Sequence, residues 1–151
     1  MSKPVVSEDV PQDLGHRPVF VFPYEPFDGQ YSDDEDTDAR YISVGIAQWW
    51  GDLSVKIMRH TGKKWSRQSE ELPLHRAIDA VICIILALFK NNAGVIEIAQ
   101  DTFWRQDEPF QVSREQRTVS ENREFNRLLD ESLKASPNII KNRLRVLSDL
   151  L

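Results

Sequence analysis

The stretch that decides the fold is YISVGIAQWWGDLSVKIMRH, residues 41–60, in which two β-rich runs flank Gly51-Asp52. A Gly-Asp pair between such runs is typical of a two-residue hairpin turn. With that turn, residue 50 would face 53, 48 would face 55, 46 would face 57 and 44 would face 59. Alternation along both strands then places seven apolar residues on one face: Ile42, Val44, Ile46, Trp50, Leu53, Val55 and Ile57. The sequence therefore predicts a hairpin with one coherent apolar face, on which Gln48 is an exception.

The opposite face of this hairpin carries mostly small residues, with two aromatic side chains and a methionine towards its ends. They are Tyr41, Ser43, Gly45, Ala47, Trp49, Ser54, Lys56, Met58 and His60. A row of small residues lets another backbone approach closely. Two interpretations stay open: a mostly solvated face, or a contact surface for a partner or a second protomer.

A long helix follows the hairpin. Pro73 suits the first turn of a helix, and Asn91-Asn92-Ala93-Gly94 suits its end. Between them, Ala80–Phe89 is apolar on every side, which is typical of a helix at the centre of its domain. We predict a central helix over residues 73–90, in which Cys83 is a small buried hydrophobic residue rather than a reactive thiol.

The remaining elements are shorter. Residues 18–22, bracketed by Pro18 and Pro23, predict a strand at an edge of the sheet or at its entry, and residues 95–99 predict another strand. Apolar stripes predict a helix over 121–134 and a second one that starts at Ser136-Pro137. The expected fold is α+β: a small antiparallel sheet packed on a central apolar helix, with a C-terminal helical pair. We expect residues 1–15 to form a flexible arm and residues 16–151 a single domain.

Composition limits the compartment and the class of protein. A chain of 151 residues, 40% of them hydrophobic, suits a packed globular domain. A single cysteine excludes an intramolecular disulfide. The N-terminal residues lack the apolar stretch of a secretory signal, and the longest apolar run is too short to span a bilayer. We expect a cytoplasmic protein with no membrane association.

Charge is unevenly distributed along the chain. Residues 1–40 hold ten acids and three bases, a net charge of −7, whereas residues 41–151 have a net charge of +2. The chain as a whole should repel nucleic acid, so we do not expect a nucleic-acid partner.

An acidic loop contains Asp33, Asp34, Asp36 and Asp38. A calcium loop beginning at Asp34 would need glycine where Ala39 stands and glutamate where Gly45 stands. We therefore predict a solvated acidic loop, and neither a metal nor a cofactor.

One polar segment, residues 56–79, lies between a strand end and the start of the central helix. Its candidate binding residues are Arg59, Lys63, Lys64, Trp65, Arg67, Gln68, Glu70 and Glu71. Three interpretations compete. In the first, the bases form a solvated turn. In the second, the segment binds an anionic group: a phosphate, an acidic partner or the protein's own loop at 33–38. In the third, the segment is catalytic.

In the catalytic interpretation, His60 and His75 act as a base and acid pair around a phosphodiester, with Arg67 or Arg76 stabilising charge. Asp79, one helical turn after His75, would orient it or form a structural ion pair. No zinc-binding, phosphate-loop, nucleophile-elbow or Cys-x-x-Cys motif is present in the sequence.

The stretch Lys64–Arg76, together with Gly45-Ile46-Ala47-Gln48-Trp49 upstream, resembles a bacterial family of small uncharacterised proteins. The resemblance covers residues 18–90. That family has no assigned activity, so the resemblance implies no functional residue.

The function that we expect is therefore non-enzymatic: a small cytoplasmic binding or adaptor protein, with a protein partner or self-association. An inhibitor or immunity-type protein is one subclass, in which the acidic loop engages a basic partner. The alternative is a metal-independent phosphodiesterase or nuclease using His60 and His75.

Overall fold

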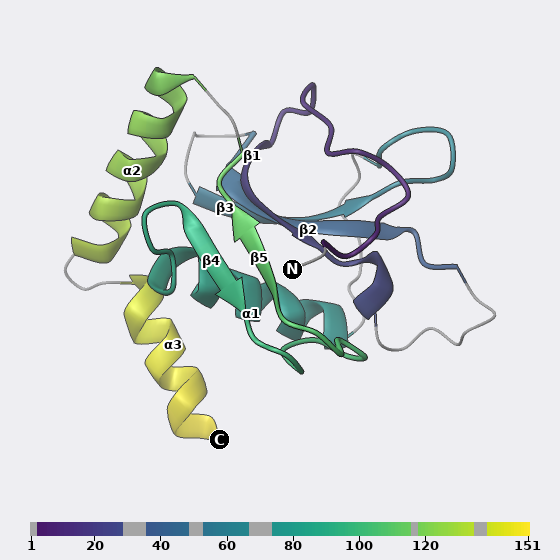
Figure 1. Cartoon of the computed structure of the whole chain (residues 1–151). Helices are drawn as coiled ribbons and strands as arrows, with labels where there is room; N and C mark the ends of the chain where they lie inside the picture. The colour runs from purple at the N-terminus through teal and green to yellow at the C-terminus, as the bar shows by residue number, and fades with distance from the viewer. Residues whose placement is uncertain (1–2, 29–35, 49–52, 67–73, 116–117, 135–138) are drawn as a thin grey trace. The chain divides into compact units, whose positions relative to one another are not determined.

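The computed structural model describes residues 3–28, 36–48, 53–66, 74–115, 118–134 and 139–151 (Figure 1). Its elements are β1 (Arg17–Pro23), the 3-10 turn η1 (Glu25–Phe27), β2 (Ala39–Ile46), β3 (Leu53–Arg59), α1 (Leu74–Phe89), β4 (Val95–Ile98), β5 (Phe110–Ser113), α2 (Val119–Lys134) and α3 (Ile139–Leu150). Small antiparallel sheets with three helices, the last two forming a C-terminal pair, confirm the predicted α+β class.

The chain divides into two compact units, residues 1–115 and residues 116–151. The first unit includes the N-terminal residues that we predicted as a separate arm. The single domain over 16–151 stays a prediction.

The predicted hairpin pairs β2 with β3, but in a different register. Ile46 faces Leu53 and Val44 faces Val55, whereas a turn at residues 51–52 would have put Ile46 opposite residue 57. The register was wrong because β2 already ends at Ile46. The shift is four residues, an even number, so the same side chains still share a face. Gly51-Asp52, Trp49 and Trp50 lie outside the described residues.

One face of the sheet, the helix face, carries Ile42, Val44 and Ile46, which are all buried. Helix α1 packs against β2 and β3. Its own buried stripe consists of small side chains and one arginine: Arg76, Ala80, Cys83 and Ala87. This spacing of four, three and four residues repeats on one side of a helix, and small side chains let the helix approach the sheet closely.

The prediction that this helix is buried on every side was wrong, because among the described side chains of α1 only this stripe and Leu88 are buried. Ile78, on another side, is 61% exposed. The burial of Cys83 confirms its predicted role as a small hydrophobic residue, and it raises the pKa of the thiol.

The other face, the strap face, carries Tyr41, Ser43 and Met58, which are also buried. Residues 3–16, which we call the N-terminal strap, cover it; the purple segment beside β2 in Figure 1 is this part of the chain. The interpretation of a mostly solvated face was wrong, since the chain's own N-terminal residues occupy this face. No pattern within residues 41–60 predicts this contact, because the two segments are far apart in the chain. A contact surface for a partner or a second protomer stays a prediction.

Strand β1 forms an edge of the three-stranded sheet, as predicted. Prolines stand at positions 18 and 23 of this strand, and the backbone N–H of Glu115 donates to the carbonyl of Val19 at 2.7 Å. A long-range backbone hydrogen bond therefore covers part of this edge.

Residues 95–98 do form a strand, but not in the main sheet. Strand β4 pairs with β5, which we did not predict, in a separate two-stranded sheet. Phe110 of β5 faces Ile98 of β4. Phe27 stacks on Phe110 at 5.8 Å and on Phe103 at 5.9 Å. These ring contacts hold Phe103 and Phe110 in place, although the sequence around them shows no clear periodicity.

The second unit contains the predicted helical pair. Thr118 and Glu121 form a reciprocal cap at the start of α2: the Thr118 hydroxyl accepts from the Glu121 N–H, and the Glu121 carboxylate accepts from the Thr118 N–H. On α3, Leu147 and Leu150 are exposed by 46% and 78%. The predicted start of the last helix at Ser136-Pro137 lies outside the described residues. Among the helices that the structure describes, none has the length and apolarity to cross a membrane.

Candidate functional site

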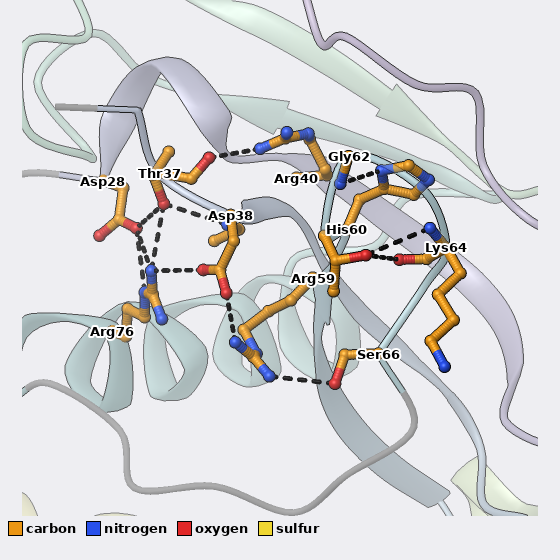
Figure 2. Close-up of polar contacts among 12 residues, drawn as sticks. Asp28, Thr37, Asp38, Arg40, Arg59, His60, Gly62, Lys64, Ser66 and Arg76 are labelled. Carbon is orange, nitrogen blue, oxygen red and sulfur yellow. Dashed lines mark hydrogen bonds and ion pairs between the residues drawn. The ribbon is translucent and has the colours of Figure 1, made fainter.

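A buried carboxylate, Asp28, organises the polar residues at the start of α1. The Arg76 guanidinium donates to it through Nε at 2.9 Å and Nη2 at 2.7 Å, and the Thr37 hydroxyl donates at 2.6 Å. Nε2 of His75 bonds to the other carboxylate oxygen. The side chain of Asp28 is fully buried and that of Arg76 is 5% exposed. These four residues, with Asp38, are called the Asp28 network below (Figure 2 shows all but His75).

Hydrogen bonds decide the charge state of Asp28. Burial alone would raise the pKa of its carboxyl, but the donors Arg76, Thr37 and His75 outweigh burial and hold the pKa below its ordinary value. Asp28 is therefore an anion whose charge is satisfied inside the protein.

Asp38 connects this network to β3. One of its carboxylate oxygens lies 3.3 Å from Nη2 of Arg76, and the other pairs with Arg59. Arg59 also donates to the Ser66 hydroxyl at 3.0 Å (Figure 2). The predicted anion site at residues 59–67 thus has a carboxylate of the chain's own acidic loop as a partner of Arg59.

Asp79 does not contact His75 as the catalytic interpretation expected. Its carboxylate accepts a hydrogen bond from the Tyr24 hydroxyl at 2.6 Å. Burial raises the pKa of Asp79 despite that bond. His75 is oriented instead by Asp28, which lies 47 residues away in the sequence and so escapes a search for helical spacing.

The other ring nitrogen of His75, Nδ1, is buried and has no hydrogen-bond partner among the described residues. In a neutral ring whose Nε2 donates to Asp28 this atom is an acceptor, and in an imidazolium it is a donor. Asp28 holds the imidazole of His75 as a carboxylate holds the histidine that acts as a general base.

His60 lies at a separate turn, residues 60–65. Its ring packs edge-on against Trp65 with centroids 5.1 Å apart, and its Nδ1 accepts from the Gly62 N–H at 3.1 Å. Gly62 has a φ of +92°, which favours glycine. Lys63 and Lys64 are exposed at the tip of this turn. No described contact joins His60 to His75, which bind different carboxylates, those of Glu8 and Asp28.

Glu8 of the N-terminal strap lies at the junction between strap and sheet. Its carboxylate pairs with Nε of Arg40 and lies 3.2 Å from Nδ1 of His60, and its carbonyl accepts from the Tyr41 hydroxyl at 2.5 Å. Burial, together with nearby carboxylates of which Asp9 is foremost, raises the pKa of Tyr41 to about 12. The hydroxyl therefore keeps the proton that it donates.

His16 fixes the end of the strap next to β1. It is 4% exposed, and its two ring nitrogens lie 2.8 Å from the Ser43 hydroxyl and 2.9 Å from the Ser54 hydroxyl. Both hydroxyls belong to the strap face, so the small residues of this face receive a polar side chain from the strap.

Several predicted site residues lie outside the described residues: Asp33, Asp34, Arg67, Gln68, Glu70 and Glu71. Of the acidic loop, Asp36 is exposed and Asp38 is paired as above. In the described part of the chain, no cluster of His, Cys, Asp and Glu side chains could hold a metal ion.

A hollow of about 300 Å³ lies elsewhere in the first unit. Its lining is Lys3, Pro4, Phe27, Gln106, Asp107, Glu108, Pro109 and Phe110. None of the predicted site residues contributes to it.

Sequence reasoning missed four residues: Tyr24 and Asp28, which bind side chains of α1, and Glu8 and Arg40, which join the strap to the sheet. Their partners lie 32 to 55 residues away in the chain. The one local signal was the spacing of Val6, Glu8 and Val10, which occupy every second position of Val6-Ser7-Glu8-Asp9-Val10.

Comparison with known proteins gives a family but no activity. A model of a family of unknown function, DUF6530, matches residues 8–151. No curated protein and no solved structure matches the chain. The match confirms the resemblance to an uncharacterised family and extends it beyond residues 18–90. The chain therefore belongs to the DUF6530 family of unknown function.

Proposed function

We propose that this chain is a non-enzymatic protein-binding protein. The observation that carries the proposal is the internal pairing of the charged side chains that a catalytic role would need. Arg76 and His75 bind the buried Asp28, and Arg59 binds Asp38. A buried charge that loses its partner costs several kcal/mol, so the buried pair of Asp28 and Arg76 is not readily released to a substrate.

Exposed apolar side chains support a binding role. Ile78 on α1 is 61% exposed, and on α3 Val146 and Leu147 are exposed by 49% and 46%. Aliphatic side chains left in water on helices are a common feature of surfaces that contact other proteins.

The partner's charge is a finer part of this proposal. The acidic loop would engage a basic partner, as in an inhibitor or immunity-type protein. The exposed Lys63 and Lys64 would contact acidic groups of a partner at the turn, since no carboxylate of the described residues forms an ion pair with either lysine.

The test is quantitative capture of a partner from a lysate of the native cells, followed by mass spectrometry. The test variants are Lys63→Glu/Lys64→Glu and Asp33→Asn/Asp34→Asn/Asp36→Asn, and the control is the exposed Lys134→Glu on α2. We expect at least one test variant to lower the captured amount several-fold and the control to leave it unchanged. Undiminished capture by both test variants contradicts the assignment of these surfaces. Trp65→Ala is a weaker test, because Trp65 packs on His60 and Tyr41.

A phosphodiesterase is the second candidate, favoured by one observation, the orientation of His75 by Asp28. It predicts hydrolysis of bis(p-nitrophenyl) phosphate or of a single-stranded oligonucleotide that disappears in both His60→Asn and His75→Asn. We expect no hydrolysis that depends on these residues. Activity lost in both variants, with folding intact, would replace the binding proposal.

A further inference from the structure

The N-terminal strap is bound to the sheet as an extended peptide. Along residues 3–10, exposed and half-buried side chains alternate: Lys3, Val5, Ser7 and Asp9 are exposed, whereas Pro4, Val6, Glu8 and Val10 are half-buried. This period of two is that of a β-strand, in which every second side chain faces the surface beneath. Yet residues 3–14 belong to no described strand. Side chains, rather than a backbone ladder, therefore supply its specific contacts.

Apolar anchors lie on both sides of a central acid. Val6 and Val10 pack against the cluster formed by Tyr41 and Met58, to which Leu14 and Val21 also belong. Trp65 packs at the border of the same cluster. Beneath the strap the sheet thus offers an aromatic and aliphatic surface.

The acid between the anchors meets the guanidinium of Arg40. Glu8 pairs with Arg40, whose side chain is only 11% exposed, and lies beside His60. Next to it, the backbone N–H and hydroxyl of Ser7 both donate to the carboxylate of Glu25 at 2.7 Å. Charge and hydrogen-bonding groups of the strap are therefore complemented residue by residue.

We propose that the strap face is a docking surface for an extended segment of a partner protein with the pattern apolar-x-acid-x-apolar, and that Val6–Val10 of this chain occupy it as an internal competitor. The proposal rests on the protein-binding function and names one surface and the chemistry of its partner. Recognition of an extended segment by pockets for alternate side chains is an established mode of peptide binding.

The internal competitor sets what a binding experiment should show. A tethered segment has an effective concentration on the order of millimolar. A separate peptide therefore binds weakly to the intact chain, and binds more tightly when the strap is weakened. Near the end of the strap, Gly15 lies close to Gln48. A Cβ added at Gly15 would be 2.6 Å from the Gln48 side chain.

The experiment uses the full chain and a fluorescent synthetic peptide with the sequence of residues 3–12. Val6→Asp places a charge against the apolar cluster beneath the strap. Val5→Asp is the matched control, because Val5 is 83% exposed. We expect Val6→Asp to bind the peptide at least tenfold more tightly than the wild type and Val5→Asp to bind it like the wild type. Equal affinities for the two variants overturn the proposal.

A second pair protects the test if Val6→Asp unfolds the chain. Glu8→Gln keeps the shape and removes the charge, and Asp9→Asn is its control on the exposed side of the strap. Peptide affinity should rise several-fold only in Glu8→Gln, and a peptide carrying Gln in place of that glutamate should bind more weakly to every form. An unchanged affinity in folded Glu8→Gln overturns the proposal.

Other occupants give different results in the same variants. Dimers in sedimentation that exclude the peptide would indicate strap exchange with a second copy, and preferential binding of a labelled oligothymidylate would indicate nucleic acid. Either result overturns the proposal. Both are distinguishable from failure of the protein-binding function, since partner capture through Lys63 and Lys64 is measured separately and with the strap intact.

Discussion

The two faces of the three-stranded sheet are covered in different ways. A helix of small and aliphatic side chains lies against the helix face, where Ile42, Val44 and Ile46 point. An extended segment with one central acid lies against the strap face, where Tyr41 and Met58 point. The first interface depends on area and close packing, and the second combines apolar anchors with a few specific polar contacts. Coverage by a helix is hard to displace, whereas an extended segment can be exchanged for another.

The largest expected effect lies at the end of the helix face. Arg76→Met leaves the fully buried Asp28 carboxylate without its bidentate partner, which should lower the free energy of unfolding by about 3–5 kcal/mol. Urea unfolding followed by circular dichroism measures it. The double variant Asp28→Asn/Arg76→Met removes both charges and should recover part of the loss. Equal losses in the single and double variants would show that the ion pair does not anchor the helix.

Shortening a buried side chain on the strap face should lower the free energy of unfolding somewhat less than Arg76→Met does. Met58 is fully buried beneath the strap, and Met58→Ala should lower the free energy of unfolding by about 2–5 kcal/mol. Val55→Ala, on the same strand but on the helix face and 37% exposed, is the control, with an expected loss of about 1 kcal/mol or less. If both variants lose the same small amount in urea, the strap does not seal its face as tightly as the helix seals the other.

The buried Asp28 and the half-buried Asp79 should respond oppositely to pH. The folded-state pKa of Asp28 is lowered, so its contribution to stability is present above the unfolded-state pKa and is lost as the pH falls through the folded value. The folded-state pKa of Asp79 is raised by burial, so its contribution is present at low pH and is lost as the pH rises through the folded value.

Asp79→Asn should therefore stabilise the protein at neutral pH, with a gain that shrinks in acid, and Asp28→Asn should destabilise it at neutral pH, with a loss that shrinks in acid. We expect the Asp79 effect to be smaller than that of Arg76→Met. Urea unfolding between about pH 3 and pH 8 at constant ionic strength spans the ordinary carboxyl range. Parallel pH profiles for the two variants would contradict the assignment.

The smallest expected effect concerns one hydrogen bond of the strap. Tyr41→Phe removes the hydroxyl that donates to the Glu8 carbonyl and keeps the ring in the cluster. We expect a loss of about 0.5–1.5 kcal/mol in unfolding free energy. Limited proteolysis should detect faster cleavage within residues 3–14 than in the wild type. Unchanged cleavage would mean that the apolar anchors alone hold the strap.

The helix face could be predicted from the sequence because its signals are local. Alternation in residues 41–60 and the apolar run Ala80–Phe89 identify a hairpin and a helix without knowledge of distant contacts. The register could not be predicted, since it depends on where β2 ends, and Gln48 lies against Gly15 rather than in the strand. Thr118 and Glu121 were a local signal for the start of α2 that we did not use.

The strap face and the Asp28 network could not be predicted in this way. Glu8 and Arg40 lie 32 residues apart in the sequence, and Asp28 and Arg76 lie 48 residues apart. No periodicity links such pairs, and a single sequence offers many equally plausible partners for each charge. The candidate residues His60 and His75 were identified, but their partners were not.

The arrangement at β1 has a consequence for behaviour at high concentration. A strand at the margin of a sheet is a template on which another chain can add its own backbone, which is one origin of fibrils. Here prolines 18 and 23 have no amide hydrogen to offer, and the carbonyl of Val19 is already taken by Glu115. At this margin the protein resists runaway polymerisation, so concentrated samples should remain free of ordered aggregates that grow from β1.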